Sequence, residues 1–192
     1  MVIAHAQVRR WTRQEYERLA AQGVFAPAER VELIEGEIVA MTPQASPHAT
    51  AVGLTQDVMV RVFPRGFNVR VQLPLALGAR SMPEPDIAIV VGERREYREA
   101  HPTTAVLVVE VADTTLEFDR IEKASMYAVA GIPDYWVLNI AERVLEVYRD
   151  PAPFPGTPFG HGYRTHLRCG PADRVAPLAA PSAFINVADL LP

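Results

Sequence analysis

Three ionisable side chains in the middle of the chain have the types and order of a metal-dependent hydrolytic site. Asp86 heads an apolar run, Glu110 lies inside a second apolar run, and Lys123 follows on the next segment. Carboxylate oxygens bind Mg²⁺ or Mn²⁺, ions that polarise a phosphodiester and acidify a bound water. A lysine beside such an ion could orient the water or stabilise the charge that develops on the phosphate.

Lys123 is the only lysine in the chain. The sequence has 19 Lys and Arg residues together, and every other one is an arginine. An arginine is a wide fork that stays protonated, whereas a lysine is a compact point charge whose pKa responds to its surroundings. Either would serve solubility, so the single lysine indicates a site that needs the smaller cation. The alternative is a surface ion pair with Asp119, worth about 0.2–0.5 kcal/mol.

The two apolar runs that carry the carboxylates are predicted strands. Residues 86–91 and 105–111 are short, rich in β-branched residues and apolar on both faces, as in a sheet covered on both sides. An unpaired carboxylate buried in such a strand costs roughly several kcal/mol. We therefore expect a metal ion, a cation or hydrogen bonds to compensate Glu110; a structural ion pair with an arginine is the alternative.

A helix is predicted to follow and to carry Lys123. The segment Thr114-Thr-Leu-Glu117 fits a capping box at its start, and a glycine and a proline near 131–133 indicate its end. Asp119, Lys123 and Tyr127 recur every four residues and so share one face of the helix. Lys123 lies about two turns in, so its stem can reach back toward the preceding strand.

The remaining pattern predicts an α/β (α+β) fold with a central mixed sheet. Helices are expected at 11–22 and 48–63, with a short one near 93–100 and a helical turn near 184–191. Strands are expected at 68–77, 134–139, 144–149 and 163–167, with a hairpin at 30–41 and a loop at 150–160. The 192 residues suit one domain, 1–192, with a single core.

The order of the site residues resembles that of the PD-(D/E)xK nuclease superfamily, and more closely that of the Uma-two family of restriction-endonuclease-like proteins. The resemblance rests on motifs spread over most of the chain: residues 32–38, 41–43, His48, 84–87, 107–111, 119–120, Lys123, 127–128 and 130–136. In the usual superfamily pattern the lysine lies two residues after the glutamate, where this chain has Ala112. Uma-two members carry the lysine on the following helix, which matches Lys123.

This resemblance implies a fold, an activity and a set of site residues. The fold would be restriction-endonuclease-like, with a four- or five-strand sheet flanked by helices and an N-terminal helix plus hairpin. The activity would be Mg²⁺- or Mn²⁺-dependent endonuclease cleavage of DNA, with Asp86 and Glu110 as metal ligands and Lys123 positioning the attacking water. Glu32 would be a further acidic contributor, and His48 a proton carrier or phosphate contact. A duplex substrate would imply a two-fold homodimer, because each site cuts one strand.

The net charge and the hydropathy of the chain indicate which partners and which cellular location to expect. The net charge of −4 is weak evidence against a strongly DNA-binding surface. The arginines at 94, 95 and 98, and those at 9, 10 and 13, are either phosphate contacts or parts of solvated faces. No apolar run approaches 18 residues and the N-terminus lacks a signal-peptide core, so we expect a cytoplasmic protein without a membrane span. The lone Cys169 excludes an intramolecular disulfide and a cysteine-based zinc site.

A second hypothesis is a catalytically silent binding or regulatory module that keeps the nuclease fold and acts through an unknown protein partner. The acidic net charge and the additional carboxylate of Asp113 favour it. It predicts that Asp86 and Glu110 are bonded to basic side chains instead of a metal ion. A third possibility is hydrolysis of RNA or another phosphodiester by the same residues.

Overall fold

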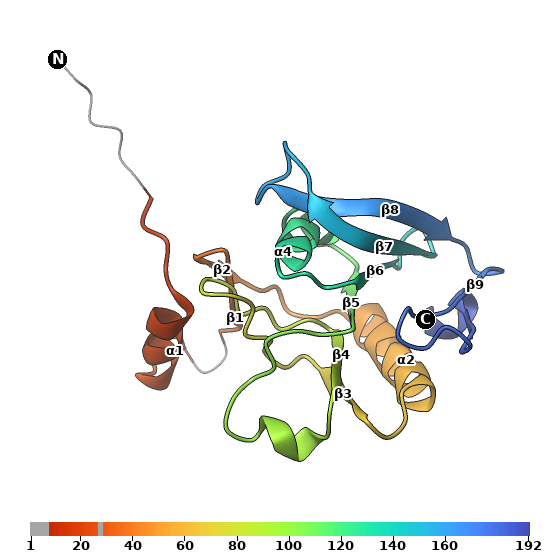
Figure 1. The fold of residues 1–192 in the computed structure, drawn as a ribbon, viewed down its shortest axis with the longest axis horizontal. Coiled ribbons are helices and arrows are strands. Elements are labelled where there is room, and N and C mark those ends of the chain that lie inside the picture. Colours follow the sequence, from red (N-terminus) through yellow and green to blue (C-terminus); the bar gives the residue numbers. More distant parts are fainter. Residues whose placement is uncertain (1–7, 27–28) are drawn as a thin grey trace.

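A six-stranded mixed sheet forms the centre of the protein in the computed structural model, which describes residues 8–26 and 29–192 (Figure 1). The strands follow one another across the sheet in the order β3, β4, β5, β6, β7, β8. Their bounds are β3 Phe67–Val71, β4 Ile87–Val91, β5 Leu107–Ala112, β6 Asp134–Asn139, β7 Val144–Pro153 and β8 His161–Cys169. Only β5 and β6 pair in parallel, because a helical crossover connects them.

Each face of the sheet is covered, as the doubly apolar strands predicted. Along β5, Leu107, Val109 and Val111 pack with helix α2 (Ser46–Val62). Val108 and Ala112 point the other way, into the core that includes helix α4 (Ala124–Val129). Figure 1 shows α2 and α4 on opposite sides of the strands. Because side chains alternate along a strand, Glu110 faces the α4 side.

The crossover that carries Lys123 is one helix with an irregular middle. A short segment α3 (Leu116–Phe118) leads into a π-helical turn η2 (Asp119–Lys123), which continues as α4. In this turn the amide of Ala124 reaches the carbonyl of Asp119, five residues back, and the Tyr135 hydroxyl donates to the same carbonyl at 2.8 Å. Such turns occur frequently at functional sites.

The ends of this helix differ in how well the sequence predicted them. Gly131 ends the helix with a φ of 72°, as expected for a glycine C-terminal cap. The predicted capping box is wrong. Thr115 precedes the helix, but its hydroxyl donates to the Asp119 carboxylate at 2.6 Å and caps no backbone amide, while Glu117 pairs with Arg120.

A small N-terminal unit lies against the edge of the site. It consists of helix α1 (Arg13–Ala21) and the hairpin of β1 (Val31–Ile34) and β2 (Glu37–Ala40). Thr12 and Glu15 form a capping box at the start of α1. The remaining elements are η1 Arg94–Tyr97, β9 Arg174–Val175, β10 Ile185–Asn186 and η3 Val187–Leu190. Nowhere in residues 8–26 or 29–192 is a helix both long and apolar enough to cross a membrane.

The sheet differs from the prediction at one edge and in its size. It has six strands, not four or five. The strand expected at 68–77 ends at Val71, because Gln72 adopts a φ of 50° and Pro74 follows shortly after. The turn directs the side chain of Gln72 toward Asp86. The shorter strand therefore contributes directly to the candidate site.

The predicted loop at 150–160 is shorter than expected, because β7 continues to Pro153 and pairs with β8 along its whole length. Beyond Arg149, β7 has no β6 partner, so Pro151 and Pro153 remove no hydrogen bond from a central ladder. The C-terminal turn near 184–191 is confirmed in part: η3 packs against α2, preceded by the short strand β10.

Asp134 joins the start of β6 to β7 and to the C-terminal segment, so its substitution tests the fold. Its fully buried carboxylate accepts hydrogen bonds at 2.8 Å from each of Trp136 Nε1, Arg149 Nε and the Leu178 amide. Asp134→Ala leaves the Arg149 guanidinium without its carboxylate, so we expect the free energy of unfolding in urea to fall by about 3–5 kcal/mol. Glu17→Ala, which removes an exposed helix pair, should cost less than about 0.5 kcal/mol; an equal loss in both would contradict this role.

Candidate active site

The register of β4 and β5 brings the two predicted metal-binding carboxylates together. The ladder pairs Ile87 with Val109 and ends there, because the residue before Asp86 is a proline and cannot donate. Continuing the register places Asp86 opposite Glu110. The Val111 amide donates to Asp86 Oδ2 at 2.9 Å, and the Asp86 amide lies 3.4 Å from Glu110 Oε2.

Lys123 reaches Glu110 from the helix, as its position predicted. Its Nζ lies 3.0 Å from Glu110 Oε1, and the Tyr127 hydroxyl donates to the same oxygen at 2.7 Å. Lys123 and Asp119 are each only 2 % exposed, and their charged atoms are 3.8 Å apart. The surface-pair alternative for these two residues is therefore wrong.

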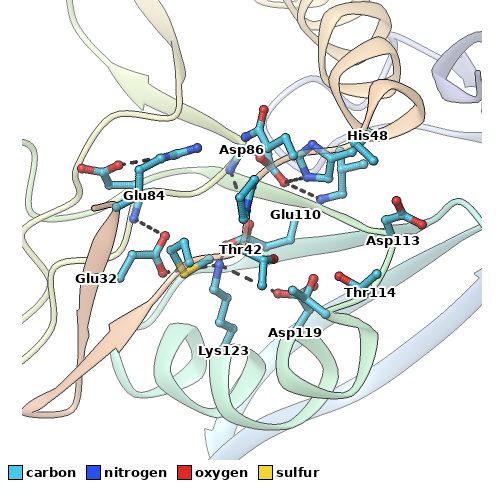
Figure 2. Close-up of a pocket in the computed structure, with 17 residues that line it drawn as sticks. Glu32, Thr42, His48, Glu84, Asp86, Glu110, Asp113, Thr114, Asp119 and Lys123 are labelled. Carbon is cyan, nitrogen blue, oxygen red and sulfur yellow. Dashed lines mark hydrogen bonds and ion pairs between the residues drawn. The ribbon is translucent and has the colours of Figure 1, made fainter. Parts of the chain in front are cut away.

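The two accessory residues also lie at this cluster. Glu32, on β1, accepts the Glu84 amide at 3.0 Å through Oε1, and its Oε2 lies 3.5 Å from Lys123 Nζ. His48, in the first turn of α2, places Nε2 3.2 Å from Asp86 Oδ2. Figure 2 shows these side chains converging from the hairpin, α2, the two central strands and the crossover helix.

Together these residues line a cavity of about 100 Å³ (Figure 2). Asp113 and Thr114, just after β5, form part of its wall, as do Thr42 and Pro43 in the loop before α2. A water occupies about 30 Å³ of liquid, so the cavity holds an ion with a few waters but no large ligand. A polymer could reach it only by placing one phosphate at the opening.

Asp86 and His48 stabilise each other's charged forms. Burial alone would raise the pKa of Asp86, but hydrogen bonds from His48, Gln72 and the Val111 amide hold that pKa below its ordinary value. Burial alone would lower the pKa of His48, but its bond to Asp86 and the nearby charges of Asp86 and Asp113 raise it. The pair is therefore an ionised carboxylate beside a readily protonated imidazole.

Around Lys123 the carboxylates outnumber the available cations. Burial, with the charges of Asp119, Asp86 and Glu32, raises the pKa of Glu110 to about 8 although Lys123 opposes it. Burial likewise raises the pKa of Asp119 to about 6. Burial alone would lower the pKa of Lys123, but the charges of Glu110, Glu32 and Asp119 raise it, so this ammonium remains charged. One lysine does not neutralise this cluster.

The donor set fits a hard divalent cation. Its oxygens are carboxylates, the ligands that Mg²⁺ and Mn²⁺ prefer. Glu32 Oε2 is buried and has no hydrogen-bond partner among the described residues. A cation would supply the charge that Lys123 alone cannot. As the side chains stand, residues 8–26 and 29–192 contain no three His, Cys, Asp or Glu groups arranged around a common ion position.

Comparison with protein families identifies the chain. A family model described as "Uma2: Putative restriction endonuclease" matches residues 13–162. The chain belongs to the Uma2 family. This confirms the resemblance seen in the sequence motifs, since the matched range contains all five predicted site residues. No curated protein matches the chain.

A solved structure confirms the fold expected for a Uma2 protein. The crystal structure of "a putative nuclease belonging to DUF820" from Anabaena variabilis superposes with a TM-score of 0.69 at 19 % sequence identity. The match covers 93 % of this chain and 96 % of that one. At this identity the likeness concerns the fold alone, a nuclease-like mixed sheet with flanking helices.

Three further residues of the site were not assigned to it from the sequence. Asp119 and Tyr127 had been placed on the face of Lys123, and their four-residue spacing was the signal that could have identified them. Gln72 donates to Asp86 Oδ1 at 3.0 Å from its unusual backbone conformation. Its role depends on a turn that ends β3 early, and the apolar pattern around it gave no sign of this turn.

The charge excess predicts how the metal-free protein responds to pH. A carboxyl group with a raised pKa holds its proton more tightly in the folded state, so its contribution to stability is complete below its ordinary pKa. For Glu110 that contribution declines as the pH rises from 4.5 toward about 8. We expect the unfolding temperature in EDTA to fall between pH 5 and pH 8, and to fall less in Glu110→Gln. Glu99→Gln, at an exposed side chain, should keep the wild-type slope; a Glu110→Gln slope equal to wild type would contradict the assignment.

Proposed function

We propose that this protein is a divalent-metal-dependent endonuclease that hydrolyses phosphodiester bonds of DNA, with Asp86 and Glu110 as metal ligands. The observation that carries the proposal is the cluster of buried carboxylates around Lys123, where burial together with the charges of Asp119, Asp86 and Glu32 raises the pKa of Glu110 to about 8. Burying such a cluster without enough cations is costly, and a functional role accounts for its retention. The family description, a restriction endonuclease, supports DNA as the substrate.

The residues have distinct roles in this proposal. A divalent ion bound at Asp86 and Glu110 would polarise the phosphodiester and acidify a water. Lys123, 3.0 Å from Glu110, is placed to hydrogen-bond the attacking water and to stabilise negative charge on the phosphate oxygens. The water oxygen bonds to phosphorus as the bond to the leaving ester oxygen breaks, and that oxygen must gain a proton.

His48 is the group in this cavity best suited to supply the proton. It lies at the start of α2, its pKa is raised, and its Nε2 contacts Asp86. Glu32 holds the hairpin against the site through the Glu84 amide and adds negative charge beside Lys123. For a duplex substrate the proposal includes a two-fold homodimer, since each copy cuts one strand.

One observation favours a second candidate, the catalytically silent module. Both proposed ligands already have partners: His48 and Gln72 bond Asp86, while Lys123 and Tyr127 bond Glu110. A cluster that satisfies itself with protein groups would need no metal. The two candidates therefore differ in whether the protein binds the ion as well as in whether it cleaves DNA.

Calorimetric titration with Mg²⁺ or Mn²⁺ measures binding of the ion. We expect wild-type protein to bind the ion and Glu110→Gln to bind it at least about tenfold more weakly, since the amide loses the ligand charge. The control Glu99→Gln alters an exposed side chain that lies outside the cavity lining, and it should bind as wild type does. Absence of binding in wild-type protein would exclude the metal site and favour the silent module.

Cleavage of a supercoiled plasmid with Mg²⁺ or Mn²⁺ tests the catalytic assignment. We expect Asp86→Ala and Lys123→Ala each to reduce the rate by more than about 100-fold, because the first removes a proposed metal ligand and the second removes the positive charge beside the reacting phosphate. Circular dichroism and urea unfolding verify that the variants remain folded. Glu122→Gln, beside Lys123 in sequence but outside the cavity lining, should retain the wild-type rate. Cleavage that persists in both alanine variants would remove these residues from the mechanism.

A further inference from the structure

The ion pairs divide the predicted phosphate-contacting arginines into two groups. Arginines 9, 10, 13 and 98 each have a carboxylate partner, at 2.6 Å for Arg9 with Glu15 and 3.0 Å for Arg98 with Glu99. Their charges are locally neutralised. Arg94 and Arg95, by contrast, form no ion pair with any described carboxylate, and neither do Arg65 and Arg70.

These four arginines gather around β3, an edge strand of the sheet that pairs only with β4. Arg65 precedes the strand, Arg70 belongs to it, and Arg94 and Arg95 lie on η1 just after β4. Burial lowers the pKa of Arg70 below its ordinary value; Tyr97 opposes this change and the charge of Arg94 adds to it. Because neither Arg70 nor Arg94 has a carboxylate partner among the described residues, we expect this region to attract the anionic group of a bound molecule.

A groove of about 370 Å³ runs beside this edge, between the end of α2 and η1. Arg65 and Arg94 line it, together with the neighbouring rings of Phe63 and Phe67 and the exposed side chain of Val60. Glu93 is the carboxylate of the lining, and its Oε1 accepts the Gly66 amide at 3.4 Å. The remaining lining residues are Gln56, Pro64, Asn68 and Val69.

Two buried donors at this strand lack acceptors. Asn68 lines the groove and is 7 % exposed, yet its Nδ2 has no hydrogen-bond partner in the described part of the chain. Arg70, two residues along on the same face, is 6 % exposed and its Nε is also unpartnered there. A buried donor without an acceptor costs about 1–3 kcal/mol.

The groove and the candidate active site lie along the same strand. Gln72, directly after β3, donates to Asp86, whereas Asn68 lines the groove. Gln72 lies four positions beyond Asn68, which corresponds to about 13 Å at ~3.3 Å per residue. Along helix α2, His48 and Phe63 are fifteen positions apart, or about 22 Å at ~1.5 Å per residue. In a DNA duplex one strand advances ~3.4 Å per base step, so these separations correspond to about four to seven steps.

We propose that the β3-edge groove, at Arg65 and Arg94, binds the phosphate backbone of the DNA strand being cut, about four to seven nucleotides from the scissile phosphate. This deepens the proposed nuclease function and rests on it. The groove brings together arginines that have no carboxylate partner among the described residues, on a chain whose net charge is −4. Arginine forks are common donors to phosphate oxygens, and such contacts position DNA without reading its sequence.

Binding of a short fluorescein-labelled DNA duplex, measured by fluorescence anisotropy with Ca²⁺ in place of Mg²⁺, tests the groove apart from cleavage. We expect the double variant Arg65→Gln/Arg94→Gln to raise Kd about tenfold. The slope of log K against log salt concentration should become shallower by about 1.8, the value for two phosphate contacts. The control Arg80→Gln/Arg174→Gln removes the same charge from positions outside the groove lining. It should change Kd by no more than about twofold and leave the salt slope as in wild type.

The outcomes separate this proposal from the nuclease assignment. A groove variant that binds like wild type, or a control that weakens binding equally, overturns the groove. The groove proposal is also overturned if the wild-type protein binds no DNA. In that case the unpaired edge of β3 would be available to pair with a strand of a partner protein. If wild type cleaves DNA and the groove variant binds unchanged, the groove fails and the nuclease stands. If wild type shows groove-dependent binding but no metal-dependent cleavage, the groove stands and the nuclease fails.

Discussion

The buried ammonium of Lys123 is the interaction on which the site depends. It lies within 4 Å of the carboxylates of Glu32, Asp119 and Glu110, so it links the hairpin, the crossover helix and the central strand. Removing it would leave several buried anions facing one another. The ammonium attracts all three carboxylates, but its single positive charge neutralises only part of their negative charge. The remaining excess makes the cavity both costly to build and suited to a second cation.

The π-helical turn has a structural part in this arrangement. It carries Asp119 and Lys123 on the buried side and Arg120 on the other, where Arg120 pairs with the buried Glu146. Tyr135, from β6, stabilises the turn by donating to the Asp119 carbonyl. These interactions hold the irregular helix in place on both of its sides. Packing and hydrogen bonds away from the cavity therefore fix the position from which the Lys123 side chain extends.

Local patterns predicted most of the fold and singled out three candidate residues that the structure brings together, Asp86, Glu110 and Lys123, but they failed where tertiary contacts decide. The apolar runs at 86–91 and 105–111 identified both strands because burial on two faces leaves a continuous signal. The end of β3 was misjudged, since Gln72 turns away only because Asp86 and Pro85 accept its hydrogen bonds. The threonine cap failed for a similar reason: Asp119 takes the hydroxyl of Thr115. Family membership added the identity of the fold, which no single motif supplied.

The Glu32–Lys123 contact has a consequence for how the chain acquires its site. The two residues are about ninety positions apart, and β5 joins β6 across a whole helix, so both contacts close long loops. Contacts of this kind form late, after the intervening strands and helix have been ordered. The nascent chain therefore carries all the acidic groups well before it can arrange them. We therefore expect the cavity to be completed late in folding, when these long loops have closed.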